Sequence, residues 1–199
     1  MNLLYLVNKN YVQNKMSRIR FHSIEALSKL TSITITGIGF PHYDNNKTVN
    51  DNIINLEHLL NKKFHGVIAY KPLEYKHFHD LDILKIIRYN EMYDKNLTIH
   101  EIIQSQPDIV ICHHQNDYLE YQSLYNKNKE KFNNLSISFY HLPHCINTNI
   151  FKDYHLPKKY DITFSGALGN SILGNHYPVR QKLLEIATKF VKKYPQYNL

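Results

Sequence analysis

The chain has 199 residues, of which 43% are hydrophobic; this fraction suits a packed core and argues against a disordered protein. No apolar run approaches the roughly 20 residues that a membrane-spanning helix needs. The two cysteines, Cys112 and Cys145, argue against a disulfide framework and favour a reducing cytoplasm. The net charge of +7 favours a polyanionic partner, yet the lysines are scattered among Asn and acidic residues, as on an ordinary solvated surface.

In chain order, short apolar runs alternate with helical patterns, which predicts a parallel sheet covered by helices on both faces. The expected strands are residues 3–7, 32–36, 66–70, 83–90, 108–114 and 135–142, and the expected helices are residues 17–30, 49–60, 98–106 and 117–127. Thr98, with Glu101 three residues later, is typical of a capping box, so we expect the third helix to begin there. These elements predict one complete, Rossmann-like doubly wound α/β domain.

After residue 147 the pattern changes. Residues 148–159 are polar and aromatic, contain proline and follow neither period, which predicts a linker. A strand pattern starts again at Tyr160, and a glycine-bearing loop and a helix over residues 177–193 follow it, with Pro178 in the first turn. We therefore expect residues 1–147 to form an N-terminal domain and residues 160–199 to begin a second, incomplete Rossmann-like domain.

Several segments in a fixed order carry a family resemblance. They are GIGFPHYD after the second expected strand, RYNEMYD after the fourth, ICHHQND after the fifth, and HLPHCINTNIF leading into YDITFSGAL and YPVRQKLLE. In these the chain resembles the GT-B glycosyltransferases, specifically glycosyltransferase-like proteins of bacteria and large DNA viruses. The resemblance implies an N-terminal domain for the acceptor and a C-terminal domain for a nucleotide-sugar, of which this chain has only the first strand, loop and helix.

The loop and helix of the second unit offer groups that suit a diphosphate. Backbone N–H groups at a helix N-terminus carry partial positive charge, and an arginine in the first turn adds a charge-assisted contact. With the resemblance, this predicts donor-diphosphate contacts from Ser165, Gly166, Gly169 and Arg180. The loop matches neither a Walker A motif nor G-x-G-x-x-G, so a plain surface loop with a solvated Arg180 remains the alternative.

Loops after the expected strands supply the acceptor-side candidates, since open α/β sheets bind ligands there. Gly37 and Gly39 permit a close backbone approach or a positive φ. For the general base we expect Glu91 or His114, and for acceptor contacts Gly39, Asn90 and His113. The alternatives are a plain turn, an exposed loop acid and ordinary strand-end histidines.

Cysteines and histidines near the ends of the fifth and sixth expected strands could in principle bind zinc: Cys112, His113, His114, His141, His144 and Cys145. Neither H-x-x-x-H nor C-x-x-C spacing is present, and adjacent strand residues point to opposite faces. We therefore predict no metal site and no tightly bound cofactor, with the nucleotide-sugar acting as substrate.

The predicted function is transfer of a sugar from a nucleotide-sugar to an acceptor hydroxyl in an intact enzyme, whose donor site a further domain or chain would complete. A non-catalytic binding module derived from a glycosyltransferase is the alternative, favoured for this chain alone by the missing donor half. A nucleic-acid-binding protein follows only from the net charge, because no segment interleaves basic and aromatic residues as a stacking surface would.

Overall fold

The structure is a computed structural model that describes residues 1–10, 24–89, 92, 94–143, 155, 157, 160 and 176–197, the side chains of 176–180 excepted. The chain divides into two compact units, Met1–Phe151 and Lys152–Leu199. In the second unit the described regular element is helix α6 (His176–Lys193). Of the strand and glycine-bearing loop predicted before this helix, Tyr160 is described and has no regular structure, and the rest lies outside the described residues.

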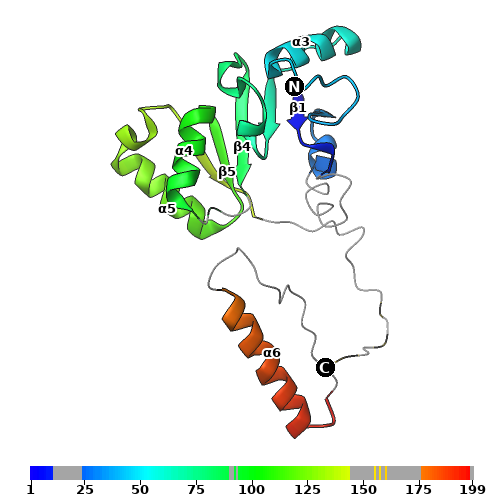
Figure 1. Cartoon of the computed structure of the whole chain (residues 1–199), viewed down its shortest axis with the longest axis vertical. Helices are drawn as coiled ribbons and strands as arrows, with labels where there is room; N and C mark the ends of the chain where they lie inside the picture. The colour runs from blue at the N-terminus through cyan, green and yellow to red at the C-terminus, as the bar shows by residue number, and fades with distance from the viewer. Residues whose placement is uncertain are drawn as a thin grey trace. The chain divides into compact units, whose positions relative to one another are not determined.

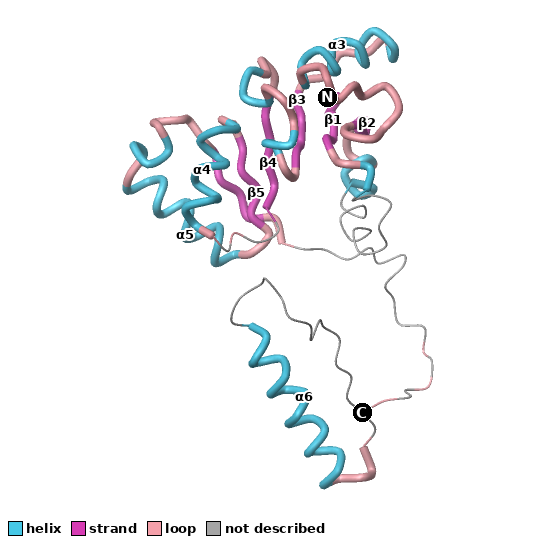
Figure 2. The backbone as a smooth tube through the Cα atoms, in the orientation of Figure 1, coloured by secondary structure: helices cyan, strands magenta, loops and turns pink. Residues whose placement is uncertain are grey.

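One parallel sheet forms the centre of the first unit (Figures 1 and 2). Its six strands are β1 (Asn2–Leu6), β2 (Ser32–Thr36), β3 (Gly66–Ala69), β4 (Leu84–Tyr89), β5 (Ile109–Cys112) and β6 (Ser138–His141), in the order β2-β1-β3-β4-β5-β6. Every neighbouring pair is parallel. The predicted α/β class with a Rossmann-like parallel sheet is therefore confirmed, and each strand overlaps a predicted one.

Helices cover the sheet according to the direction in which the chain crosses it. From β2 onward every connection runs the same way, so right-handed crossovers place α3 (Val49–Leu60), α4 (Lys95–Ser105) and α5 (Gln115–Lys127) on one face. Short 3₁₀ helices interrupt these connections at η2 (Pro72–Glu74), η3 (Phe78–Asp80) and η4 (Lys129–Phe132). The connection from β1 to β2 runs the opposite way and therefore crosses the other face, where residues 24–28 are helical.

Two hydrophobic clusters match these two faces. The larger joins inward side chains of the strands to those of α3, α4 and α5, and Leu4, Val67, Ile87 and Val110 in it are fully buried. The smaller joins Ile24 to Leu3, Tyr5, Ile68 and Ile86 on the opposite face. Alternating strand residues thus enter different clusters, as the period of two in a β-strand requires.

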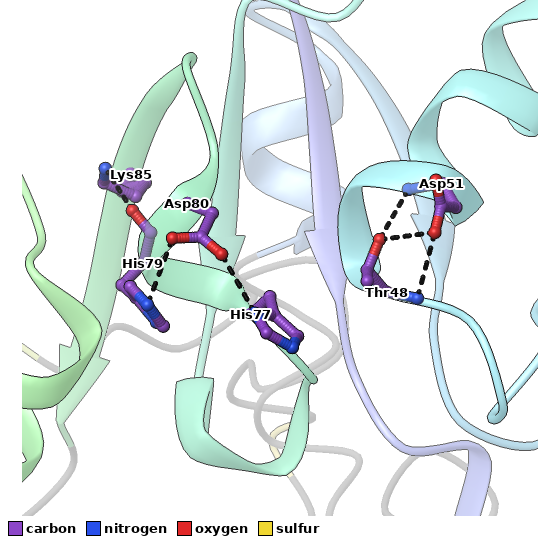
Figure 3. Close-up of polar contacts among 6 residues, drawn as sticks. All are labelled: Thr48, Asp51, His77, His79, Asp80 and Lys85. Atoms are coloured by element: carbon purple, nitrogen blue, oxygen red, sulfur yellow. Dashed lines mark hydrogen bonds and ion pairs between the residues drawn. The ribbon is translucent and has the colours of Figure 1, made fainter.

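Helix starts were predicted with unequal success. Helix α3 covers the predicted residues, and its N-cap Thr48 forms a capping box with Asp51 (Figure 3). For α4, the predicted capping box at Thr98 and Glu101 is wrong. Asp94 is the N-cap and accepts a hydrogen bond from the Leu97 N–H at 3.0 Å, so the helix begins earlier and Thr98 is buried inside it.

None of the described helices is long and apolar enough to cross a bilayer. Helix α6 is nevertheless amphipathic, with Leu183, Ile186 and Phe190 along one side. At its end the Phe190 ring packs against those of Tyr194 and Tyr197, with centroids 4.9 and 5.4 Å away. The α6 helix overlaps the helix predicted over residues 177–193.

Candidate functional site

The carboxyl edge of the sheet is the candidate site because the strand order changes direction there. Strand β1 lies between β2 and β3, so the chain extends the sheet first to one side and then to the other. In open α/β sheets, ligands bind beyond the carboxyl ends of the strands at such a reversal. The loops that leave β1 and β3 therefore flank the position that topology favours, and the loop that leaves β2 lies beside that of β1.

Two glycines lie in the loop that leaves β2, against the loop that leaves β1. Gly37 has φ +139°, and a Cβ on it would lie 2.4 Å from the Val7 carbonyl oxygen. Gly39 has φ +84° and lies beside Lys9. The Lys9 N–H donates to the Ile38 carbonyl at 2.9 Å, so the backbone segments that follow β1 and β2 continue side by side. The predicted close approach and positive φ are confirmed, whereas the acceptor contact of Gly39 stays a prediction.

A buried polar network links the ends of four strands. The Arg88 guanidinium, from β4, donates from Nε to His113 Nε2 at 3.1 Å and from Nη1 to Tyr5 Oη at 3.3 Å. Its second amine lies 2.7 Å from the same His113 nitrogen. His113 Nδ1 lies 2.6 Å from the carbonyl oxygen of Leu142, just after β6. Arg88 and His113 are 8% and 5% exposed, so the network is held inside the protein.

The partners of His113 determine its proton positions. A guanidinium has only donors, so His113 Nε2 accepts and carries no hydrogen. The ring then carries its hydrogen on Nδ1, which donates to the Leu142 carbonyl. His113 is therefore a neutral imidazole that joins β5 to β4 and β6. These contacts position the ends of the three strands relative to one another. The predicted contact of His113 with an acceptor is not tested by these hydrogen bonds.

Arg88 was not singled out in the sequence, although a signal was present. It is the charged residue near the carboxyl end of the predicted strand over residues 83–90, in a position whose neighbours in alternation, Leu84 and Ile86, contact the smaller core cluster. A charge in that register must find partners inside the protein. The partners themselves were not predictable, because Tyr5 is 83 residues away in sequence.

A second polar group lies on the other face, between β4 and α4. The Tyr89 hydroxyl is buried, and burial, followed by the nearby Glu101 carboxylate, raises the pKa of Tyr89 well above its ordinary value. Burial also raises the pKa of Glu101, and the Tyr89 hydroxyl and Lys71 only partly offset it. Among the described residues the Tyr89 hydroxyl makes no hydrogen bond of regular geometry, so it affects the pKa of Glu101 by lying close to that carboxylate.

Cys112 is a structural residue. It is fully buried, with Sγ 3.7 Å from the Met92 sulfur, and burial, with Asp117 adding to it, raises the pKa of the thiol to about 12. Cys112 and His113 belong to opposite faces, as strand alternation predicted. His141 instead packs its ring against Tyr118, with centroids 6.1 Å apart. Within the described residues, the cysteines and histidines at the strand ends do not gather as metal ligands.

The other predicted site residues are placed only in part. His114 is exposed at the N-cap of α5, and its side chain does not cap that helix. Arg180 lies in the first half of α6, where only the backbone is described. The remaining predicted residues lie outside the described residues: Asn90, Glu91, Ser165, Gly166 and Gly169.

An open surface pocket of about 310 Å³ lies elsewhere, between α4, α5 and η4. Ile99, Ile103 and Leu124 line it together with Lys95 and Lys131, and Asn96 and His100 complete the lining. Lys95 also forms an ion pair with Glu120. No residue of the carboxyl-edge network lines this pocket, so its volume does not bear on the candidate site.

No family model, curated protein or solved structure matches this chain. The fold class therefore follows from the sheet topology alone. A functional assignment depends on the geometry at the carboxyl edge and on the sequence resemblance.

Proposed function

We propose that the first unit is the acceptor-binding part of a glycosyltransferase-like protein, which transfers a sugar from a nucleotide-sugar to an acceptor hydroxyl. The observation that carries the proposal is the carboxyl edge itself. Beside the β1/β3 reversal, the close pass of Gly37 and the turn at Gly39 hold the loop that leaves β2 against the loop that leaves β1, so the backbone of both loops lies at the strand ends. Backbone groups and a few fixed polar side chains are what a hydroxyl-rich ligand requires.

The buried network supports this proposal by fixing the loops around the site. Arg88 and His113 hold the ends of β4, β5 and β6 together. His114 follows directly and begins α5, so its backbone is set by the same contacts. Binding groups supported by a rigid second layer lose less entropy when a ligand binds.

The reaction needs one bond to break and one to form. The anomeric carbon loses its bond to the diphosphate oxygen and gains a bond to the acceptor oxygen, whose proton passes to a base. Glu91 or His114 is the proposed base. On the donor side, the N-terminus of α6 and Arg180 would offset the charge that develops on the leaving diphosphate, with Ser165, Gly166 and Gly169 in the preceding loop.

Nuclear magnetic resonance titration of the full chain tests the site. Unlabelled mono- and disaccharides are added to ¹⁵N-labelled protein, and UDP-glucose and GDP-mannose are added in separate experiments. We expect the saccharides to shift the amides of Gly37, Gly39 and His114 in a saturable manner. His114→Ala should weaken that binding, whereas His100→Ala, a change at an exposed helical histidine, should not.

The alternative, a binding module without catalysis, gives a different result. Saccharide binding at the carboxyl edge without sugar transfer, even when a nucleotide-sugar is present, would favour the module. Shifts confined to the α4–α5 pocket, or no saccharide binding at millimolar concentration, would overturn the proposed site altogether.

A further inference from the structure

A cluster of metal-binding side chains lies in the connection between β3 and β4, at His77, His79 and Asp80 of η3 (Figure 3). His77 Nδ1 lies 2.9 Å from Asp80 Oδ2, and His79 Nε2 lies 3.1 Å from Asp80 Oδ1. The three candidate ligand atoms lie within 4.8 Å of one another. All three side chains are about half exposed, so a dissolved ion can reach them.

The local backbone explains why these side chains meet. In a 3₁₀ helix, residues three apart lie on the same side, which brings His77 and Asp80 together. Phe78, between the two histidines, is 2% exposed and Leu81 is 3% exposed, so both anchor the segment in the larger core cluster. His77 has φ +60°, in the left-handed region. The buried anchors thus fix a backbone in which both imidazoles face one carboxylate.

The distances suit a small divalent ion. Zinc binds imidazole nitrogen and carboxylate oxygen at about 2.0–2.2 Å, so neighbouring ligand atoms are about 2.9 Å apart at right angles and about 3.4 Å apart in a tetrahedron. The two N···O distances, 2.9 and 3.1 Å, lie within that range. The two distances end on different Asp80 oxygens, so small side-chain rotations, or a carboxylate that binds through both oxygens, would place the three side chains around one ion.

We propose that His77, His79 and Asp80 bind a Zn²⁺-class transition-metal ion. Two imidazoles and one carboxylate favour zinc, nickel or cobalt over magnesium and calcium, which prefer all-oxygen ligand sets. Three protein ligands leave at least one coordination position for water. The site is therefore of the open, exchangeable kind, and it is separate from the residues proposed for sugar transfer.

Lys85 has two opposite effects on the binding of a metal ion at this cluster. The Lys85 ammonium donates to the backbone carbonyls of His79 and Leu81, at 3.2 and 3.0 Å, which restrains the segment but adds a positive charge nearby. The competing interpretation is a carboxylate that hydrogen-bonds two imidazoles without any ion. Only metal titration distinguishes the two.

The experiment uses the full chain stripped of metal with a chelator. Zn²⁺ is titrated in competition with a chromophoric chelator, and Co²⁺ absorption reports the geometry of the bound ion. We expect one site stronger than the remaining histidines provide, and an affinity at least about tenfold lower in each of His77→Ala, His79→Ala and Asp80→Asn. His100→Ala is the matched control and should bind as the natural chain does.

A second readout needs no variant. Long-range ¹H–¹⁵N spectra of the natural chain should show His77 Nδ1 and His79 Nε2 changing on addition of one equivalent of Zn²⁺. Unaltered imidazole signals at these residues, or equal zinc affinity in the His77→Ala/His79→Ala double variant, would overturn the proposal. Thermal unfolding of each metal-free variant confirms that a lost affinity does not reflect an unfolded chain.

Discussion

The guanidinium of Arg88 donates hydrogen bonds to two buried side chains from other parts of the sheet, His113 and Tyr5. One residue thus links three strands near the carboxyl edge. Its donors reach His113 and Tyr5, and none of the three is adjacent in sequence. Buried polar groups that lose a partner keep the cost of their lost hydration. The contacts of Arg88 are therefore structural. Under the proposed function, Arg88 acts only through the loops that it positions.

Arg88→Met should expose this dependence, because methionine matches the arginine side chain as far as Nε and has no donors. We expect the free energy of unfolding to fall by about 1–3 kcal/mol, as His113 Nε2 and Tyr5 Oη lose these donors inside the protein. Urea denaturation followed by circular dichroism measures the change. Lys29→Met, at an exposed position, is the control, and an equal loss in both variants would contradict the role of Arg88.

Glu101 gives a pH-dependent prediction. Its folded pKa is raised above the ordinary 4.5 by burial, so the ionised form is penalised in the native state, and the penalty disappears as the pH falls below the folded pKa. Glu101→Gln should therefore be at least as stable as the natural chain at pH 7, and its advantage should shrink toward pH 4.5. Urea denaturation across this range measures it.

Glu57 is the control of opposite sign. Burial raises the pKa of Glu57, but hydrogen bonds from Lys63 and the Phe64 N–H outweigh that effect and leave the pKa lowered. Its contribution is present above the unfolded pKa and is lost as the pH falls through the folded pKa. Glu57→Gln should thus be destabilising at pH 7 and less so in acid. The same pH trend for both variants would refute this assignment.

At the scale of elements, strands β1 and β2 depend on the glycine that follows β2. A Cβ at Gly37 would meet the Val7 carbonyl oxygen at 2.4 Å, and φ is positive there. We expect Gly37→Ala to cost about 2–5 kcal/mol, the sum of backbone strain and a steric clash. Gly39→Ala should cost less, about 1–2 kcal/mol, because its Cβ would meet only the side chain of Lys9 at 3.2 Å. Thermal unfolding of the two variants provides the comparison.

Sequence patterns predicted the elements better than the contacts between them. The alternation of apolar runs was sufficient for all the strands of the sheet, and apolar residues at helical spacing gave the bounds of α3. The start of α4 was wrong because Asp94 competes as N-cap one turn earlier. Local spacing carries these signals, whereas the meeting of Arg88 with His113 depends on strand order, which no local pattern contains.

The candidate metal cluster was missed for a different reason. The cysteines and histidines at strand ends are the more conspicuous candidates in the sequence, but the alternation of side chains separates these potential ligands. His77, His79 and Asp80 are close in sequence and required only a 3₁₀ turn to meet. Their H-x-H-D spacing was the signal, but nothing in the sequence alone showed that Phe78 would anchor the turn.

At the scale of the whole molecule, the chain divides between Phe151 and Lys152, within the stretch predicted as a linker. We expect limited proteolysis to cut first between Cys145 and Lys159. A fragment of residues 1–151 should then keep the amide spectrum of the first unit, since the sheet and both core clusters lie inside it. First cuts within β5 would contradict this boundary.

The interior place of β1, between β2 and β3, governs the order in which the sheet can be assembled during synthesis. This strand is synthesised before both of its neighbours, which are residues 32–36 on one side and 66–69 on the other. The middle of the sheet must therefore wait for β3, after which β4, β5 and β6 add one by one to a growing edge. A chain shortened by its first six residues would lose the strand that joins β2 to β3, leaving β2 with no sheet partner while β3 to β6 still pair.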